Sequence, residues 1–369
     1  MVNSENPLPY GRGSVSTEPR TLVSGSVVVD YLSPGEEDAW DRFVLSSGSG
    51  TLFHLSGWTH IVERNFRHQN YRLVARRHGR ICGVFPISRV RNRIFGDCLV
   101  SMPLAVYGGI CSDDEEAYMG LLKAGADLAK RLGVKYLEMR NRTEPFSTGL
   151  PGRDLYVTFI QDLSPGPDKL LQKLPRDTRY MVRKSLKAGL DWTEDLSVED
   201  FYEIYARSVH RLGTPVFSRK LFIDLRNEFA SRCRIFGVRK GKTAIAGVFC
   251  LYFKDQVLPY YGGALAEYNK DAPNNFMYWS LMEQSWREGL RWFDFGRSKK
   301  GTGSYQFKMS WSMDMTELPY RYCLVRAAEV PHLSPVDQKF QLPVALWKKM
   351  PFAWTKVLGP RLIRWVPSV

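Results

Sequence analysis

The sequence predicts an α/β (mixed α+β) protein made by tandem duplication of two domains, each a mixed sheet flanked by helices. The length of 369 residues is more than one ordinary domain needs. Strand-like and helix-like apolar patterns alternate from about residue 27 onward, and the same landmarks recur in the same order in each half. Hydrophobic residues make up 44% of the chain and aromatic residues 13%, which excludes a wholly disordered protein.

The first domain is expected over residues 27–160, after a flexible tail at residues 1–26 that is rich in Ser, Gly and Pro. Gly79 supplies the turn between two paired strands, and Gly133 ends a long amphipathic helix. The predicted strands cover 27–32, 71–76, 81–90 and 134–139, and the predicted helices cover 36–45 and 115–132.

The second domain is expected over residues 161–329. Its predicted strands cover 232–238, 244–253 and 292–295, and its predicted helix covers 275–288. Short words of the first half return in the second: Gly83-Val84-Phe85 as Gly247-Val248-Phe249, Tyr107-Gly108-Gly109 as Tyr261-Gly262-Gly263, and Leu132-Gly133-Val134 as Glu288-Gly289-Leu290. Three landmarks in one order favour a duplication over the chance recurrence of hairpins and helices.

The charge balance favours anionic partners. Lys and Arg number 52 against 38 Asp and Glu, which gives a net charge of +14. Such an excess suits nucleic acid, a phosphorylated carrier or an anionic membrane surface, and does not choose among them. Six scattered cysteines form no CxxC pair, which argues against a structural zinc site and a disulfide scaffold, so no metal is expected. No apolar run reaches the ~18 residues of a membrane span and no secretory signal is apparent, so a cytoplasmic location is expected.

A basic segment at residues 169–187 links the two domains. It carries seven Lys and Arg residues against the single acid Asp177, and most of these cations recur every three or four positions. That spacing predicts one helix with a cationic face. The face could be a ridge that binds phosphate or pyrophosphate, with arginines as bidentate donors, or simply a solvated linker face.

The segment from Trp292 to Lys308 is the densest candidate for a binding loop. A strand ends at Asp294 and Gly296, and a loop with three cations and two further glycines follows. Glycines let backbone N–H groups approach an anionic or carbonyl-bearing ligand closely. The loop is neither a P-loop nor a GxGxxG fingerprint. Lys308 could hold a developing oxyanion or a ligand phosphate, or be an ordinary exposed strand lysine. Asn275 could cap a helix or present the helix N-terminus to a ligand.

These motifs resemble the FemAB-like peptidyltransferases, and more closely the branch associated with PEP-CTERM/exosortase exopolysaccharide systems. The resemblance rests on residues 274–279, on Phe293 to Ser298 and on Tyr305 to Lys308, and it extends over about residues 27–365. It implies two GNAT-like domains in tandem, the second BioF2-like or FemAB-like. Better-known relatives transfer an aminoacyl group from aminoacyl-tRNA to an amine of a peptidoglycan precursor.

The resemblance also implies site residues and co-substrates. A Phe-Lys motif at the transfer site maps onto Phe307 and Lys308, and Arg179 and Arg183 are the nearest candidates for binding precursor phosphates. This chain lacks the long helical hairpin that some relatives use for tRNA. The acyl donor therefore stays open between aminoacyl-tRNA and an acyl thioester, with no tightly bound cofactor. The acceptor would be a phosphorylated or lipid-linked saccharide.

We therefore expect an acyl or aminoacyl transferase that acts on an amine or hydroxyl of a cell-envelope or exopolysaccharide precursor, by direct transfer. None of the six histidines falls in a pattern for a covalent intermediate. The predicted catalytic residues are Lys308 for the oxyanion, Asp294 to orient the acceptor or act as base, and Phe307. The predicted substrate-binding residues are Arg179, Arg183, Asn275, Gly296, Arg297, Ser298, Lys299 and Tyr305.

The last segment, residues 330–369, is predicted to be a basic aromatic appendage. From residue 338 it contains six Lys and Arg residues and no acid, with Trp347, Trp354 and Trp365 interleaved among them. This composition is typical of an interfacial segment on an anionic membrane leaflet. The alternative is a tail whose aromatic side chains pack on the second domain.

Two other function classes remain open. An acyl-CoA-dependent N-acetyltransferase for sugars would need a pyrophosphate-binding loop of the Arg/Gln-x-x-Gly-x-Gly/Ala type, which the chain lacks. A non-catalytic scaffold on a membrane surface or on nucleic acid would use the fold without its chemistry. For nucleic acid, stacking aromatics are expected along the basic segment, yet Tyr180 is the only one there.

Overall fold

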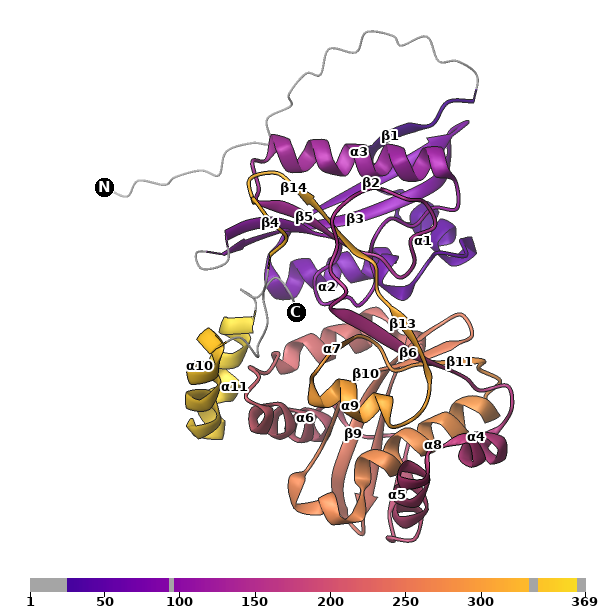
Figure 1. Ribbon diagram of the computed structural model, residues 1–369, viewed down its shortest axis with the longest axis vertical. Coiled ribbons are helices and arrows are strands. Elements are labelled where there is room, and N and C mark those ends of the chain that lie inside the picture. The colour runs from indigo at the N-terminus through magenta and orange to yellow at the C-terminus, as the bar shows by residue number, and fades with distance from the viewer. Residues whose placement is uncertain (1–24, 93–95, 332–337, 364–369) are drawn as a thin grey trace.

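The computed structural model describes residues 25–92, 96–331 and 338–363. It confirms an α/β protein with two mixed sheets, each flanked by helices, and the two sheets lie one above the other in Figure 1. The tail predicted at residues 1–26 lies almost wholly outside the described residues. In the described part of the chain, no helix is long and apolar enough to cross a membrane.

The first sheet has the strand order β1-β2-β3-β4-β5-β14. Its strands are β1 (Val28–Tyr31), β2 (Gln69–Arg77), β3 (Arg80–Asn92), β4 (Gly96–Val100), β5 (Tyr136–Arg140) and β14 (Tyr320–Leu324). Its helices are α1 (Glu37–Ser46), η1 (Leu52–His54), α2 (Ser56–Phe66) and α3 (Glu115–Arg131). Only β4 and β5 pair in parallel, and α3 connects them. Helix α3 covers one face of the sheet and α1 and α2 lie on the other (Figure 1).

The second sheet has the order β12-β6-β11-β10-β9-β8-β7, with β13 also paired to β6. Its strands are β6 (Tyr156–Asp162), β7 (Asp191–Thr193), β8 (Cys233–Lys240), β9 (Thr243–Phe253), β10 (Gln256–Ala264), β11 (Trp292–Asp294), β12 (Ser298–Lys299) and β13 (Asp314–Glu317). Its helices are α4 (Pro167–Lys173), α5 (Arg176–Leu186), α6 (Val198–Leu212), α7 (Arg219–Glu228), η2 (Ala230–Arg232), η3 (Ala266–Asp271), α8 (Pro273–Arg287) and α9 (Gly303–Met309).

The two sheets repeat one strand–helix–strand unit, as the duplication predicts. In the second sheet, α8 connects the parallel pair β10 and β11, as α3 connects β4 and β5 in the first. The repeated Gly-Val-Phe words lie in β3 and β9. The repeated Tyr-Gly-Gly words differ in their structure: Tyr261 lies within β10, whereas Tyr107 lies in the loop that follows β4.

Two strands tie the sheets together. After β13 of the second sheet the chain returns to the first sheet as β14, which pairs with β5, with Tyr320 opposite Arg140. Strand β6 begins at Tyr156 and belongs to the second sheet, although it starts before residue 160. We propose a division into domains at residues 27–160 and 161–329. Strand β6 spans this division in sequence, and β14 joins the first sheet although it lies within the second range.

The basic segment is not one helix, contrary to the prediction for residues 169–187. It forms α4 and α5, and the break falls at Leu174 and Pro175. Proline has no N–H for the helical ladder and disfavours a helical conformation at the residue before it. Leu174 is accordingly extended, with ψ of 141°.

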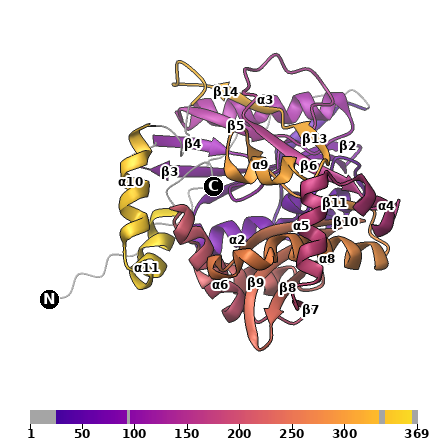
Figure 2. The same ribbon diagram turned by 60° about the horizontal axis from the view of Figure 1, so that its bottom comes forward.

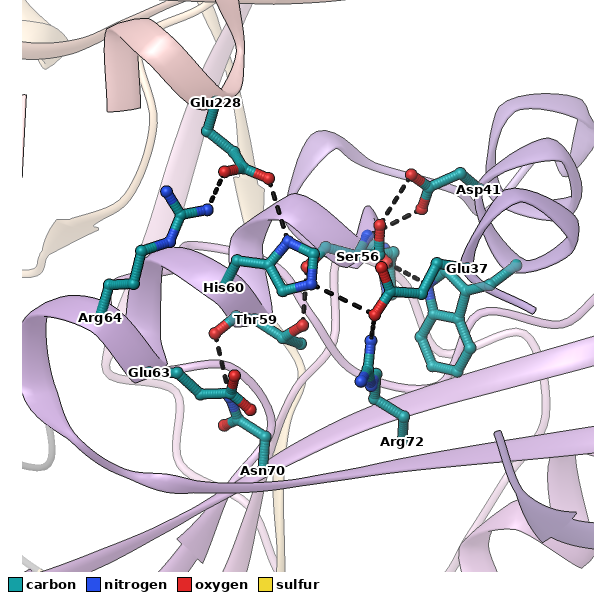
Figure 3. Close-up of polar contacts among 12 residues, drawn as sticks. Glu37, Asp41, Ser56, Thr59, His60, Glu63, Arg64, Asn70, Arg72 and Glu228 are labelled. Carbon is teal, nitrogen blue, oxygen red and sulfur yellow. Dashed lines mark hydrogen bonds and ion pairs between the residues drawn. The ribbon is translucent and has the colours of Figure 1, made fainter. Parts of the chain in front are cut away.

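A shared core and an ion-pair network join the two domains. Trp58 of α2 packs edge-on against Tyr260 of β10, with ring centroids 6.0 Å apart. Figure 3 shows the ion-pair network, in which the two ring nitrogens of His60 contact Glu37 at 3.2 Å and Glu228 at 3.1 Å. Burial disfavours a charged imidazole, but the hydrogen bonds to the two glutamates outweigh it and raise the pKa of His60. His60 thus connects α2 of the first domain to the end of α7 in the second.

The C-terminal segment forms two helices, α10 (Gln338–Lys349) and α11 (Phe352–Ile363), that pack against α6 at the side of the molecule (Figures 1 and 2). Trp347 is buried, and its carbonyl oxygen lies 3.2 Å from Nε2 of His210. The predicted alternative, in which aromatic side chains pack on the second domain, is therefore observed for Trp347. Trp365 lies outside the described residues.

Candidate active site

A pocket of about 260 Å³ opens where the parallel pair β10 and β11 separates. The two strands pair only at Gln256 with Trp292 and at Val257 with Phe293. Beyond these pairs the strands diverge, and the pocket is lined by residues that follow on both strands. Its walls are Leu104, Val106, Phe217, Leu258, Pro259, Tyr260, Tyr261, Gly262, Tyr278, Asp294, Phe295, Gly296, Arg297 and Lys308. Leu104 and Val106 come from the first domain, so both domains form this pocket.

The carboxylate of Asp294 is fully buried at the end of β11 and accepts four hydrogen bonds. Oδ1 accepts from Thr158 Oγ1 at 2.7 Å and from the backbone N–H of Gly296 at 2.8 Å. Oδ2 accepts from Tyr107 Oη at 2.8 Å and from Gln256 Nε2 at 3.1 Å. These donors satisfy a buried charge that would otherwise be very costly. They also fix the carboxylate in place, which favours an orienting role over proton transfer.

Lys308 is on helix α9 rather than on a strand, and its ammonium group reaches back to the loop after β11. The helix begins at Thr302, whose side chain caps the N–H of Tyr305. Nζ of Lys308 donates to the carbonyl oxygens of Phe295 at 2.6 Å, Gly296 at 2.9 Å and Arg297 at 3.4 Å. The alternative of an ordinary exposed strand lysine is therefore wrong.

Burial sets the protonation of this ammonium group. Although part of the Lys308 side chain is exposed, Nζ is enclosed by backbone carbonyls and lies near two charged side chains. Loss of hydration lowers the pKa of Lys308 to about 7, Asp294 acts to raise it, and Arg297 acts to lower it further. Lys308 can therefore change charge near neutral pH, as groups at functional sites often do.

The backbone around Gly296 makes these contacts possible. Gly296 has φ of +70°, a backbone conformation that residues other than glycine rarely adopt. The turn directs the carbonyls of residues 295–297 toward Lys308, and a Cβ at Gly296 would come within 3.9 Å of Val106. The glycine predicted as a binding residue thus shapes the loop as well as lining the pocket.

Arg297 forms a second cationic wall. Its guanidinium group lies 4.7 Å from the ring centroid of Tyr156 and 6.0 Å from that of Tyr320. Burial opposes its charge, but the neighbouring Tyr320 and Tyr156 favour it, and the pKa of Arg297 is raised above its already high value. Arg297 therefore stays charged at any pH of interest.

The wall from the first domain is a strained loop after β4. Met102 and Leu104 have φ of +58° and +63°, which are uncommon for residues with side chains. Hydrogen bonds across the domain boundary hold the loop: Tyr260 Oη donates to the carbonyl of Leu104, and Tyr320 Oη donates to that of Val106 at 2.5 Å. Strained backbone that persists under such constraint is often found at functional sites.

The structure brings together only part of the predicted site. Asp294, Gly296, Arg297 and Lys308 line the pocket. The other predicted residues lie off its walls: Phe307, Ser298, Lys299, Tyr305, Asn275, Arg179 and Arg183.

Some of these outlying residues support the pocket from behind. Phe307 packs against Tyr278 and Trp311, with centroids 5.7 and 6.1 Å away. Tyr305 packs on Phe159 at 5.8 Å. They position α9 and hence the ammonium group of Lys308.

The basic residues of α5 are close to α9 without entering the pocket. Arg179 donates to the carbonyl of Gln172 at 2.9 Å, and Arg183 is exposed. Thr178 Oγ1 donates to the carbonyl of Ser310 at 2.5 Å, directly after α9. Arg179, on the cationic side of α5, therefore directly follows a residue that contacts the end of the helix carrying Lys308.

The sequence predictions missed the aromatic side chains that enclose the pocket. Tyr107, Tyr260, Tyr278 and Tyr320 all contact the pocket or its supporting loops. A signal existed for Tyr107, because it stands in the repeated Tyr-Gly-Gly word. For Tyr320 there was no local signal, since it reaches the site through β14. In the described part of the chain, no group of three His, Cys, Asp or Glu side chains could hold a metal ion.

A comparison with protein families places most of the residues that line this pocket in a GNAT domain. Residues 172–309 match a family model described as an acetyltransferase (GNAT) domain, and this segment includes β10, β11 and Lys308. No curated protein sequence matches the chain. The family match supports an acyltransferase.

Several solved structures share the fold at low identity. A crystal structure of FemX is 15% identical, covers 81% of this chain and 98% of its own, and has a TM-score of 0.65. The C-terminal domain of a putative lysylphosphatidylglycerol synthetase from Agrobacterium fabrum is 12% identical, covers 79% and 92%, and has a TM-score of 0.53. A tandem GNAT protein from the clavulanic acid biosynthesis pathway is 10% identical, covers 82% and 100%, and has a TM-score of 0.50. The chain therefore has the tandem GNAT fold.

Proposed function

We propose that the protein is an acyl or aminoacyl transferase that acts on an amine or hydroxyl of a cell-envelope or exopolysaccharide precursor, in the FemAB-like branch associated with PEP-CTERM systems. One observation carries the proposal: Lys308, with its pKa lowered to about 7 by burial, lies with Asp294 in a pocket where two parallel strands of a GNAT domain separate. The shared fold with FemX supports the aminoacyl variant.

The reaction needs alignment and charge stabilisation more than covalent help from the protein. The acceptor nitrogen or oxygen attacks the acyl carbonyl and forms a tetrahedral oxyanion. The bond from the acyl carbon to the leaving oxygen or sulfur then breaks, and the acceptor's proton passes to the leaving group. Protonated Lys308 would donate to the oxyanion by giving up its longest contact, the 3.4 Å bond to the carbonyl of Arg297.

The other site residues have supporting roles in this proposal. Asp294 fixes the Gly296 turn and the Tyr107 side chain in place through hydrogen bonds, and this orients the acceptor. Arg297, which lines the pocket, holds phosphates of the donor, and Arg179 and Arg183 hold phosphates of the acceptor. On α5, beside α9, Arg183 is exposed and Arg179 is half-buried, and this position outside the pocket suits an acceptor that extends out of it.

A second candidate is an acyl-CoA-dependent N-acetyltransferase for sugars. The match of residues 172–309 to an acetyltransferase domain favours it. The two candidates share the pocket and the role of Lys308 and differ in the donor.

The test is binding of the purified protein to bulk aminoacylated tRNA and to the same tRNA after deacylation, at physiological salt. Salt is essential because a protein of net charge +14 binds any polyanion at low ionic strength. We expect a preference for charged tRNA, because only the charged form carries the aminoacyl group that is transferred. Equal or no binding would overturn aminoacyl-tRNA as donor and direct the search to acyl thioesters with a lipid-linked saccharide acceptor.

A further inference from the structure

The C-terminal helices present an apolar surface to the outside. Leu342 and Leu346 of α10 are 70% and 60% exposed, and Trp354 and Val357 of α11 are 66% and 56% exposed. We call these four residues the C-terminal apolar surface. Within each helix the two members are three or four positions apart, so they share one helix face. Single exposed apolar residues are common, but a group of large ones on two neighbouring helices indicates an interaction site.

The opposite face of the helix pair is anchored to the second domain. Thr355, Gly359 and Ile363 of α11 are buried and recur every four residues. At Gly359 an added Cβ would lie 2.8 Å from the backbone nitrogen of Val216, so the two segments are in close contact. Lys356 pairs with Glu203 of α6 at 3.0 Å. The outward direction of the α11 members of the C-terminal apolar surface, Trp354 and Val357, is thus fixed by packing on the other side of that helix.

Charge selects the occupant of this surface. Lys348, Lys349 and Arg361 are exposed on the same two helices, and residues 338–363 contain no acid. Among the described residues, none of these three cations lies within 4.0 Å of a carboxylate. A second copy of this chain would bring like charges together, because the protein carries +14 overall. Trp and Leu bordered by Lys and Arg match the boundary between lipid headgroups and acyl chains of an anionic leaflet.

The packing also connects this surface to the pocket. Val216, which contacts Gly359 of α11, is followed by Phe217, which lines the pocket. The segment between α6 and α7 therefore has the C-terminal helices on one side and the pocket on the other. A lipid leaflet on the helices would lie near the pocket that the proposed function assigns to acyl transfer.

We propose that α10 and α11 bind an anionic lipid leaflet through the C-terminal apolar surface and its cations, and that this contact delivers a lipid-linked acceptor to the pocket. The second clause rests on the proposed function, whereas the first does not. The helices would lie along the leaflet, because no described helix is long and apolar enough to cross it.

The test is co-sedimentation of the full chain with vesicles of phosphatidylglycerol and phosphatidylcholine, and with vesicles of phosphatidylcholine alone, at physiological salt. We expect binding to the anionic vesicles and little to the neutral ones. Leu346→Ser/Trp354→Ser should lose most of that binding. Lys348→Gln/Lys349→Gln should bind the anionic vesicles more weakly, by roughly fivefold or more in affinity for each cation removed.

Matched controls distinguish vesicle binding through this surface from vesicle binding through any exposed tryptophan or any basic side chain. Trp286→Ser removes a tryptophan that is 42% exposed on α8, and Lys184→Gln/Lys187→Gln removes two exposed cations, one on α5 and one directly after it. Both controls should bind vesicles as the unaltered chain does. Unchanged melting temperatures would show that each variant is folded.

Three results would overturn the lipid proposal. They are no binding to anionic vesicles, equal losses in the controls, or a dimer of the unaltered chain that Leu346→Ser/Trp354→Ser dissociates. Vesicle binding is measured without catalysis, so it stands even if transfer fails. Conversely, transfer to a water-soluble acceptor fragment that survives in Leu346→Ser/Trp354→Ser would support the proposed function independently of the membrane.

Discussion

The phenol of Tyr107 donates a 2.8 Å hydrogen bond to Oδ2 of Asp294, and the two residues are 187 positions apart in the chain. Both side chains are buried. Burial, and then the charge of Asp294, raise the pKa of Tyr107, so the phenol keeps its proton and remains a donor. This bond ties the strained first-domain loop to the carboxylate that orients the proposed reaction.

Replacing Tyr107 with Phe should destabilise the protein and slow transfer. A buried hydrogen bond to a charged group contributes about 1.5–3 kcal/mol, and the variant removes it without changing the ring. Urea unfolding should show a loss of that size, with kcat reduced as well. Tyr180→Phe is the matched control, because Tyr180 is 65% exposed on α5. Equal stability of the two variants would contradict the link between Tyr107 and Asp294.

Lys308→Met should reduce turnover by about 10²–10³-fold while the protein stays folded, as the loss of one oxyanion donor does. Steady-state transfer assays and a thermal melt would measure the two effects. Lys184→Met, on the exposed side of α5, should leave turnover unchanged. A folded Lys308→Met variant with normal turnover would remove Lys308 from the mechanism.

The pH profile separates two roles for Lys308. Burial lowers its pKa to about 7, so its positive charge is present below that pH and lost above it. If the charge stabilises the oxyanion, transfer should decline as pH rises through about 7, and the decline should be absent in Lys308→Met. A rate that instead increases through the same pH would show that neutral Lys308 acts as a base.

The ion-pair network around His60 should make stability depend on pH. Its pKa is raised in the folded protein by Glu228 and Glu37, so its contribution is fully present below about pH 6.5 and is lost as pH rises through the folded-state pKa. His60→Gln should therefore cost about 1 kcal/mol of unfolding free energy near pH 5.5 and less at pH 8.5. His78→Asn, at an exposed turn, is the comparison variant. A cost that is constant with pH would mean that His60 contributes through packing alone.

Arg179→Gln/Arg183→Gln should raise the KM for a phosphorylated acceptor by roughly tenfold and leave kcat nearly unchanged. The reason is that α5 lies outside the pocket, so these cations bind a distant part of the substrate rather than the reacting atoms. Titrating the acceptor at saturating donor would measure both constants. Lys187→Gln, at the far end of the same segment, provides the comparison, and a loss confined to kcat would contradict this placement.

Local sequence patterns predicted the repeated strand–helix–strand unit well, because the glycines that mark its turn and its helix end lie within the unit itself. The hairpin of β2 and β3 turns at Gly79, and α3 ends near Gly133, as the glycine positions indicated. The break at Pro175 was also visible in the sequence, but the regular spacing of cations favoured one continuous helix. A proline without an N–H outweighs such a periodicity.

The candidate site was predictable only where it is contiguous in sequence. Asp294, Gly296, Arg297 and Lys308 lie within one short segment, and the structure gathers them around one pocket. The opposite wall depends on tertiary contacts, such as the bond from Tyr320 to the carbonyl of Val106. No periodicity reports which strand will lie beside which, so the first-domain wall could not be deduced from the residues alone.

The pairing of β14 with β5 also has a consequence for biosynthesis. A ribosome makes the chain from its N-terminus, so β1 to β5 are complete long before residue 324 is added. Until then the free edge of β5 offers unpaired N–H and C=O groups, which are a template for wrong pairing with other chains. The nascent first sheet must therefore be kept from aggregating while every strand of the second sheet is translated.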